Sequence, residues 1–105
     1  MATRARLKIT VLRKMNAQEV YGKPLPEVAD SFPAYCNRLE VGQEFIADES
    51  GEMPAGFCHW AWHDIYPVIM HLQFGGDFWW ITKPGLLYVC CTDGVRPVFF
   101  KIERS

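Results

Sequence analysis

The sequence predicts a single α+β domain, residues 1–105, in which one main helix packs on a mainly antiparallel sheet in the order β-β-α-β-β. Three observations support this prediction. Apolar residues alternate near the start of the chain, one long amphipathic segment lies in the middle, and a turn-forming Asp93-Gly94 separates two strand-like runs near the end. With 105 residues, 50% of them hydrophobic, the chain is long enough for one domain with its own core.

The first predicted strand covers residues 7–12. Leu7, Ile9 and Val11 fall on one face, whereas Lys8 and Thr10 fall on the other. This period of two is typical of a strand with one buried face.

Residues 16–40 lose this periodicity, and we expect a long ordered loop or arm here, with a short helical turn at residues 17–21. The loop signals are one glycine and three prolines, Gly22, Pro24, Pro26 and Pro33. Residues 42–47 then predict a second strand, which the turn-forming residues 48–51 close.

The main helix is expected between Pro54, which suits a first helical turn, and Gly75-Gly76, which would end it. At about 100° per residue the apolar side chains fall within an arc of about 140°, the width of a core-facing stripe. These residues are Phe57, Cys58, Ala61, Trp62, Ile65, Val68, Ile69 and Leu72. His59, His63 and Pro67 lie off this stripe.

Residues 86–91 and 96–102 predict two antiparallel strands joined at Asp93-Gly94. A two-residue loop would pair Cys91 with Arg96, Val89 with Val98, and Leu87 with Phe100. We expect this face to pack on the helix. The other face would carry Tyr88, Cys90, Phe99 and Lys101.

Charge and hydropathy limit the expected partners. The 11 basic and 12 acidic residues give a net charge of −1 without a basic patch, so we expect no nucleic-acid partner. No run approaches the roughly 20 apolar residues of a membrane span, and the N-terminal residues do not resemble a signal peptide. We therefore expect a cytoplasmic protein without a membrane partner, whose cysteines are thiols, ligands or catalytic groups.

The chain resembles a family of short prokaryotic proteins without an established function, found chiefly in anaerobes. The family pattern has Gly-Phe-Cys-x-x-Ala-Trp, matched at 56–62, and Cys-x-Asp-Gly-x-Arg-Pro-Val-x-Phe, matched at 91–100. An upstream Cys, then Val-Gly-x-x-Phe, and a Gly-Gly-Asp correspond to Cys36, 41–45 and 75–77. The resemblance covers most of the chain except the Pro-rich loop. It implies that Cys36, Cys58 and Cys91 belong together and leaves Cys90 as the odd thiol.

Three interpretations of these thiols stay open. In the first they are buried apolar side chains, in the second they form a reactive site, and in the third Cys36, Cys58 and Cys91 bind zinc or iron. A metal is not favoured, because no Cys-x-x-Cys pair is present. In the reactive interpretation Cys91 or Cys58 is the catalytic thiolate. Arg96 would stabilise its charge, and Asp93 would orient Arg96 through a paired hydrogen bond. Alternatively, Asp93 only favours the turn and Arg96 extends into solvent.

Two further groups are candidate binding residues. His59 and His63 have the i, i+4 spacing of a metal-binding pair, but Trp60 stands where a zinc protease has Glu, and solvent exposure or an oligomer contact is favoured. Trp62, Trp79 and Trp80 could line an aromatic ligand site together with Arg96, although Trp62 lies in the core stripe.

The sequence thus leaves three functions open. The first is a binding or accessory protein with a small ligand or metal held between the helix and the 91–96 turn. The second is a small thiol-dependent enzyme that uses Cys91 or Cys58 with Arg96 and Asp93. The third is a homo-oligomeric interaction module without chemistry, because the aromatic residues exceed what a small core can bury.

Overall fold

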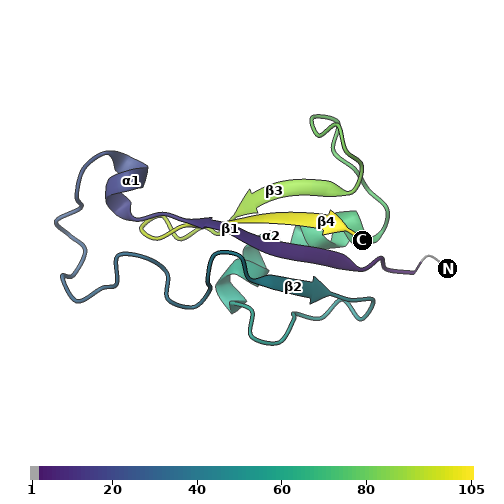
Figure 1. Ribbon diagram of the computed structural model, residues 1–105, viewed down its shortest axis with the longest axis horizontal. Helices are drawn as coiled ribbons and strands as arrows, with labels where there is room; N and C mark the ends of the chain where they lie inside the picture. Colours follow the sequence, from purple (N-terminus) through teal and green to yellow (C-terminus); the bar gives the residue numbers. More distant parts are fainter. Residues whose placement is uncertain (1–2) are drawn as a thin grey trace.

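The computed structural model describes residues 3–105 and holds, within that range, a four-stranded antiparallel sheet and two helices (Figure 1). The strands are β1 (Leu7–Lys14), β2 (Glu44–Ala47), β3 (Leu86–Cys90) and β4 (Val98–Arg104), and the helices are α1 (Ala17–Tyr21) and α2 (His59–Gln73). The strands lie in the order β2-β1-β4-β3. The predicted α+β domain is confirmed, and so is the short helical turn at 17–21.

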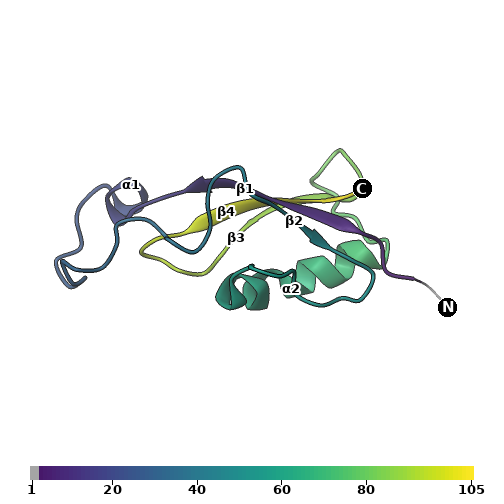
Figure 2. The same ribbon diagram turned by 60° about the horizontal axis from the view of Figure 1, so that its bottom comes forward.

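The helix α2 covers one face of the sheet, and the core lies between them (Figure 2). β1 and β4 lie at the centre of the sheet and supply the alternating side chains that fill this space. The fully buried residues include Leu7, Ile9, Val11, Val98, Phe100 and Ile102 from the strands and Ala61, Ile65, Ile69 and Leu72 from α2. Burying each large apolar side chain contributes about 1.5–3 kcal/mol, so this contact is the main source of stability.

The helix α2 begins later than the sequence indicates. Pro54 is not in its first turn; its carbonyl accepts a hydrogen bond from the N–H of Phe57 in a turn that precedes the helix. Gly56 has a φ of 81°, a left-handed value that a right-handed helix cannot include. Helical geometry therefore starts only after Cys58, the N-cap residue.

The end of α2 is where the sequence predicts it. Gly75 adopts a φ of 90°, and the N–H of Gly76 donates to the carbonyl of His71 at 2.8 Å. This is the arrangement by which a left-handed glycine ends a helix. Pro67 is exposed, which fits its expected place off the core stripe.

The register of the final hairpin differs from the prediction. Val89 pairs with Phe100 and Leu87 with Ile102, and the N–H of Cys91 donates to the carbonyl of Val98 at 3.1 Å. The predicted pairs Cys91–Arg96, Val89–Val98 and Leu87–Phe100 are therefore wrong, each by two residues. Pro97 has no N–H with which to continue the ladder, so residues 91–97 connect β3 to β4. A shift by two residues leaves each side chain on the same face of the sheet. Cys91 therefore lies on the side that packs on the helix, as predicted.

The segment between β1 and β2 extends away from the sheet, and the molecule measures 52 × 30 × 21 Å (Figure 1). Asn16 caps α1: its side chain accepts from the N–H of Glu19, and the Glu19 carboxylate accepts from the N–H of Asn16. The hydroxyl of Tyr35 donates to the same carboxylate at 3.0 Å. These bonds order the part of the arm that returns toward the sheet. In residues 3–105 no helix is long and apolar enough to cross a membrane.

Arg104, near the end of β4, connects the sheet to the C-terminal end of α2. Its guanidinium donates to the carbonyls of Leu72 and Gly76 at 3.0 and 2.6 Å and pairs with the carboxylate of Asp77. The hydrogen bond from Arg104, followed by one from the N–H of Gly85, holds the pKa of Asp77 below its ordinary value of 3.8. One side chain therefore ties the end of β4 to the last turn of α2 and to the glycine that follows the helix.

We expect Arg104→Met to lower the free energy of unfolding by about 1.5–3 kcal/mol, because charged hydrogen bonds to helix-end carbonyls are lost while the aliphatic stem remains. Urea unfolding measures this change. Because the pKa of Asp77 is lowered on folding, its stabilising effect is present above pH 3.8 and is lost as the pH falls below that value. The difference in unfolding free energy between the wild type and Arg104→Met should therefore become smaller in acid. Arg6→Met, which removes an exposed 3.7 Å pair with Glu49, is the control and should change stability by less than about 0.5 kcal/mol.

Candidate functional site

A small cavity of about 60 Å³ lies where the first turn of α2, the β3–β4 loop and the returning arm meet. Its lining includes Cys36 from the arm, Cys58 from the start of α2, and Cys91, Asp93 and Arg96 from the β3–β4 loop. The three thiols that the sequence groups together therefore line one cavity. The lower side of α2 and the face that carries Cys91 are on the same side of the sheet, as expected.

The four cysteines are all free, and they differ in environment. Cys36 is buried, and Cys58 and Cys91 are half-buried. Cys90 is exposed on the opposite face of the sheet, because neighbouring strand residues point in opposite directions. It is thus separate from the other three thiols.

Cys91 is not activated by its surroundings. Burial raises the pKa of its thiol above the ordinary value of 9.0, and hydrogen bonds from the backbone of Val98 and Asp93 only partly oppose this effect. The N–H of Val98 lies 3.3 Å from the sulfur. The thiol is therefore protonated at neutral pH, which does not favour the thiolate role that we considered for Cys91 with Arg96.

Arg96 packs on the arm between β1 and β2 and does not extend into solvent. Its side chain is only 15% exposed, and its guanidinium lies over the ring of Phe32 at 4.1 Å. One terminal nitrogen lies 3.5 Å from the carbonyl oxygen of Tyr35. Among the residues described, its buried Nε has no hydrogen-bond partner. A buried donor without an acceptor is costly, and this one belongs to a side chain that lines the cavity.

Asp93 shapes the loop more than it holds Arg96. Its Oδ1 accepts hydrogen bonds from the N–H groups of Val95 and Arg96 at 3.0 and 3.1 Å, as in an Asx turn. Its Oδ2 lies 3.6 Å from Nε of Arg96, which is an ion pair beyond hydrogen-bonding distance. The paired hydrogen bond that we expected between these side chains is therefore not formed.

The N-terminus of α2 faces the same cavity, which Cys58, Trp60 and Ala61 help to line. Cys58 is the N-cap residue, and in the described structure its side chain makes no capping hydrogen bond. The first turn also contains no acidic residue. The free N–H groups and the positive end of the helix dipole therefore remain available to a negative group.

The charged side chains that line the cavity are Arg38, Arg96 and Asp93. Together these three carry one net positive charge, so the field among the lining residues favours an anion. Lys14 does not line the cavity; its ammonium donates to the carbonyl of Cys36 at 2.9 Å and lies 3.5 Å from the carboxylate of Glu40.

A hydrogen-bonded network that the sequence analysis missed fixes the loop to α2. The carboxylate of Asp64 accepts from the N–H and the hydroxyl of Thr92 at 2.7 and 2.9 Å, and the indole N–H of Trp60 donates to that hydroxyl at 2.6 Å. Trp60 and Asp64 are four residues apart and therefore share a helix face. This spacing is the sign of the network that the sequence contains. Their common partner, Thr92, comes from a distant segment that spacing cannot identify.

The other predicted binding residues lie elsewhere. Trp62 packs on Phe57 and Tyr66, with ring centroids 6.1 and 5.6 Å apart. Trp79 and Trp80 are exposed on the loop after α2, and none of these three lines the cavity beside Arg96. The aromatic ligand site stays a prediction.

His59 and His63 are exposed on the outer face of α2, next to Tyr66 and Pro67. Within residues 3–105 no group of three or more His, Cys, Asp or Glu residues is arranged to hold a metal ion. This includes the three thiols, although they line one cavity. Zinc or iron binding by Cys36, Cys58 and Cys91, or by the two histidines, stays an untested prediction.

Comparisons of this chain with protein-family models, with curated proteins and with solved structures find no match. The resemblance to a family of short prokaryotic proteins therefore stays a prediction based on the motifs alone.

We expect Thr92→Val to loosen the β3–β4 loop, because it removes the hydroxyl that bonds both Asp64 and Trp60. Losing these two bonds should cost about 1–2 kcal/mol of unfolding free energy and increase amide hydrogen exchange in residues 91–97. Exposed Thr82 provides the matched control, Thr82→Val. Equal effects of the two substitutions would contradict a structural role for the network.

We also expect Cys91 to react at least about tenfold more slowly than exposed Cys90 with iodoacetamide at pH 7 to 8, because a raised pKa leaves less thiolate. Mass spectrometry of peptides labelled for increasing times measures both rates in one sample. The rate at Cys91 should still be rising above pH 9.0, its ordinary pKa. Faster labelling of Cys91 than of Cys90 below pH 8 would instead indicate an activated thiolate.

Proposed function

We propose that this protein is a small-ligand-binding protein that holds a small anion, or the anionic end of a small molecule, in the cavity lined by Cys36, Cys58 and Cys91. The observation that carries the proposal is the buried Nε–H of Arg96, which lacks an acceptor among the residues described. The side chain of Arg96 lines a cavity that residues of the uncapped first turn of α2 also line. Hydrogen-bond donors without acceptors, from two separate elements, are the arrangement that an anion satisfies.

The size of the cavity limits what enters it. About 60 Å³ corresponds to roughly two water molecules in the liquid, so a carboxylate or phosphate group fits better than a whole metabolite. The exposed indole of Trp60 and the guanidinium of Arg38 lie at its border. The rest of a larger ligand would extend along these two side chains.

The thiols have a supporting role in this proposal. Because the pKa of Cys91 is raised, its neutral S–H is a weak donor that does not repel an anion. A metal ion would require these thiols to lose protons and would lie near the positive charge of Arg96, which is an unfavourable combination. We favour binding over a thiol-dependent enzyme, because the surroundings of Cys91 raise its pKa and do not stabilise a thiolate.

We further propose that the protein acts in the cytoplasm, where reducing conditions keep the cavity cysteines as thiols. All four cysteines are free, which is consistent with this location. We also propose that it self-associates, through a surface on the other face of the sheet.

The test measures binding of inorganic phosphate and sulfate by isothermal titration calorimetry, with chloride as the smaller anion. We expect phosphate or sulfate to bind the wild type with 1:1 stoichiometry and to raise its melting temperature. Arg96→Lys keeps the positive charge but removes Nε–H. It should weaken binding by at least about tenfold, because a charged hydrogen bond is lost.

The matched control is Arg6→Met, which removes an exposed arginine far from the cavity and should leave binding unchanged. Circular dichroism and urea unfolding of each variant establish that it is folded. If none of the anions binds the folded wild type, or if Arg96→Lys and wild type bind equally, the proposal is wrong.

A further inference from the structure

In residues 3–105 no helix covers the face of the sheet opposite α2 (Figure 2). Side chains of mixed character lie on this face. Along β1 and β4 these are Lys8, Thr10, Leu12, Phe99, Lys101 and Glu103, which alternate with the buried core residues. Tyr88, from β3, is 57% exposed, and Leu12 and Ile46 are 39% and 40% exposed. Such an apolar surface on a small domain is typical of a contact region.

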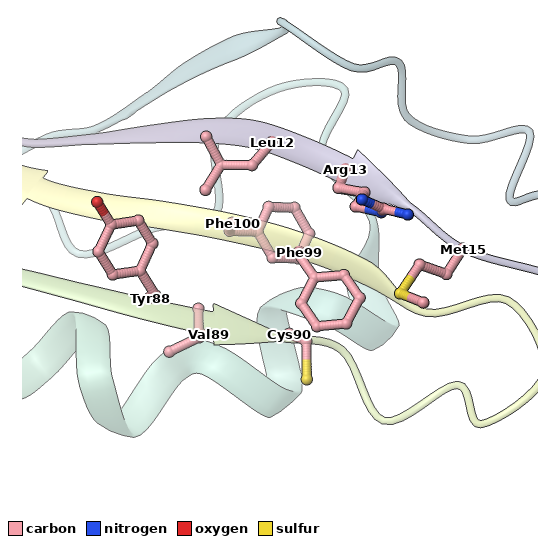
Figure 3. A pocket seen from close by; sticks show the side chains of 8 residues that line it. All are labelled: Leu12, Arg13, Met15, Tyr88, Val89, Cys90, Phe99 and Phe100. Atoms are coloured by element: carbon pink, nitrogen blue, oxygen red, sulfur yellow. The ribbon is translucent and has the colours of Figure 1, made fainter. Parts of the chain in front are cut away.

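The apolar end of this face is hollowed. A bulge between Val11 and Arg13 interrupts the pairing of β1 with β4 and places an extra residue, Leu12, in β1. Figure 3 shows Leu12, Tyr88, Phe99 and Cys90 around this shallow pocket, with Met15 beyond the end of β1. The volume of about 740 Å³ is open to solvent along the sheet, so protruding side chains can enter it.

We propose that this face binds a second copy of the same chain through a two-fold axis. The axis lies in the plane between the two sheets, runs parallel to the strands, and passes above the line between β1 and β4. Such an axis stacks the two sheets face to face and places β1 of one copy over β4 of the other. The register of β1 with β4 then determines which side chains meet. Lys8 is level with Glu103, Thr10 with Lys101, and Arg13 with Phe99.

The two copies are complementary under this operation. Lys8 lies over Glu103 of the second copy, and the same contact repeats on the other side of the axis. Arg13 meets the aromatic ring of Phe99, a favourable cation–π pair. Glu44 is level with Thr10 in β2, and Tyr88 is level with Lys101 in β3, so the carboxylate of Glu44 lies over the hydroxyl of Tyr88. Lys101 faces the neutral Thr10.

The charges of this face allow it to meet itself. Within one copy Lys8 pairs with Glu44 at 3.7 Å and Lys101 with Glu103 at 3.4 Å. Arg13 pairs with Glu19 at 3.7 Å, so these six groups sum to zero. Self-association therefore brings no net repulsion between the two faces. A partner of strong single charge would gain little from this surface, which favours a second copy as the occupant.

The area of the face indicates a weak dimer. Four strands of about six residues, at about 3.4 Å per residue and about 4.8 Å between strands, cover about 400 Å² of flat sheet per copy. The two copies together would cover about 800 Å², which is below the roughly 1,200 Å² of stable interfaces, so the association is transient and depends on concentration. The loop after α2 borders one end of the face, because Lys83 pairs with Glu103 at 3.8 Å, and limits further growth of the contact.

A charge-swap experiment by sedimentation equilibrium tests this geometry. Wild type should form a dimer in the micromolar range, and Lys8→Glu and Glu103→Lys should each raise the dimer dissociation constant by at least about tenfold, because like charges then face each other across the axis. A 1:1 mixture of the two variants should recover dimer affinity to within about threefold of wild type. In the mixed dimer Glu at position 8 meets Lys at position 103, and the unmodified Lys8 meets the unmodified Glu103.

Met70→Glu is the control, because Met70 is exposed on the outer face of α2. It adds one negative charge away from the proposed contact and should leave the dissociation constant unchanged. Recovery in the mixture shows that the single variants are folded, and circular dichroism gives an independent measure. A wild type that stays monomeric up to about 1 mM overturns the proposal. So does failure of folded variants to recombine, or equal weakening by Met70→Glu.

The experiment is independent of anion binding. Lys8 and Glu103 do not line the thiol cavity. A wild type that does not dimerise therefore leaves the proposed anion binding unaffected, and a wild type that binds no anion leaves the proposed dimer unaffected.

Discussion

The apolar contact between α2 and the inner side chains of β1 and β4 determines where the other groups of this molecule lie. It buries Ile65, Ile69 and Leu72 against Ile9, Phe100 and Ile102, and it thereby fixes the rotation of the helix about its own axis. With that rotation set, Cys58 faces inward at the start of α2, and His59 and His63 face solvent. The strand period then directs Cys91 toward the helix and Cys90 away from it.

Polar contacts at the two ends of α2 complete this arrangement, and they differ in character. At the C-terminal end, Arg104 satisfies the helix carbonyls and pairs with Asp77, so little capacity for a ligand remains. At the N-terminal end, Asp64 and Trp60 hold Thr92, but the first-turn N–H groups receive no side-chain cap in the described structure. The C-terminal end serves stability, and the uncapped N-terminal end lies against the cavity that Arg96 also lines.

The two faces of the sheet have separate roles in this interpretation. The covered face carries the core and, at its margin, the thiol cavity. The open face combines aromatic side chains with charges of both signs, and it is the surface on which we propose that a second copy docks. Because alternate residues of the same strands serve both faces, a change at Phe99 or Lys101 reaches the open face without entering the core, whereas a change at Phe100 reaches the core.

The sequence by itself determined the class of fold, the core stripe of α2, the glycine that ends it, and the face of each residue in the last hairpin, because these depend on local periodicity and on backbone freedom. It also grouped Cys36, Cys58 and Cys91, although only through a family resemblance. Only the tertiary structure decided the hairpin register, since Asp93 and Pro97 enlarge the loop while side-chain alternation is unchanged by a shift of two. The same holds for the stacking of Arg96 on Phe32, the raised pKa of Cys91 and the bonds of Asp64 to Thr92. Each of these joins segments far apart in the chain, and their proximity is set by the packing of the whole domain, which no local pattern encodes.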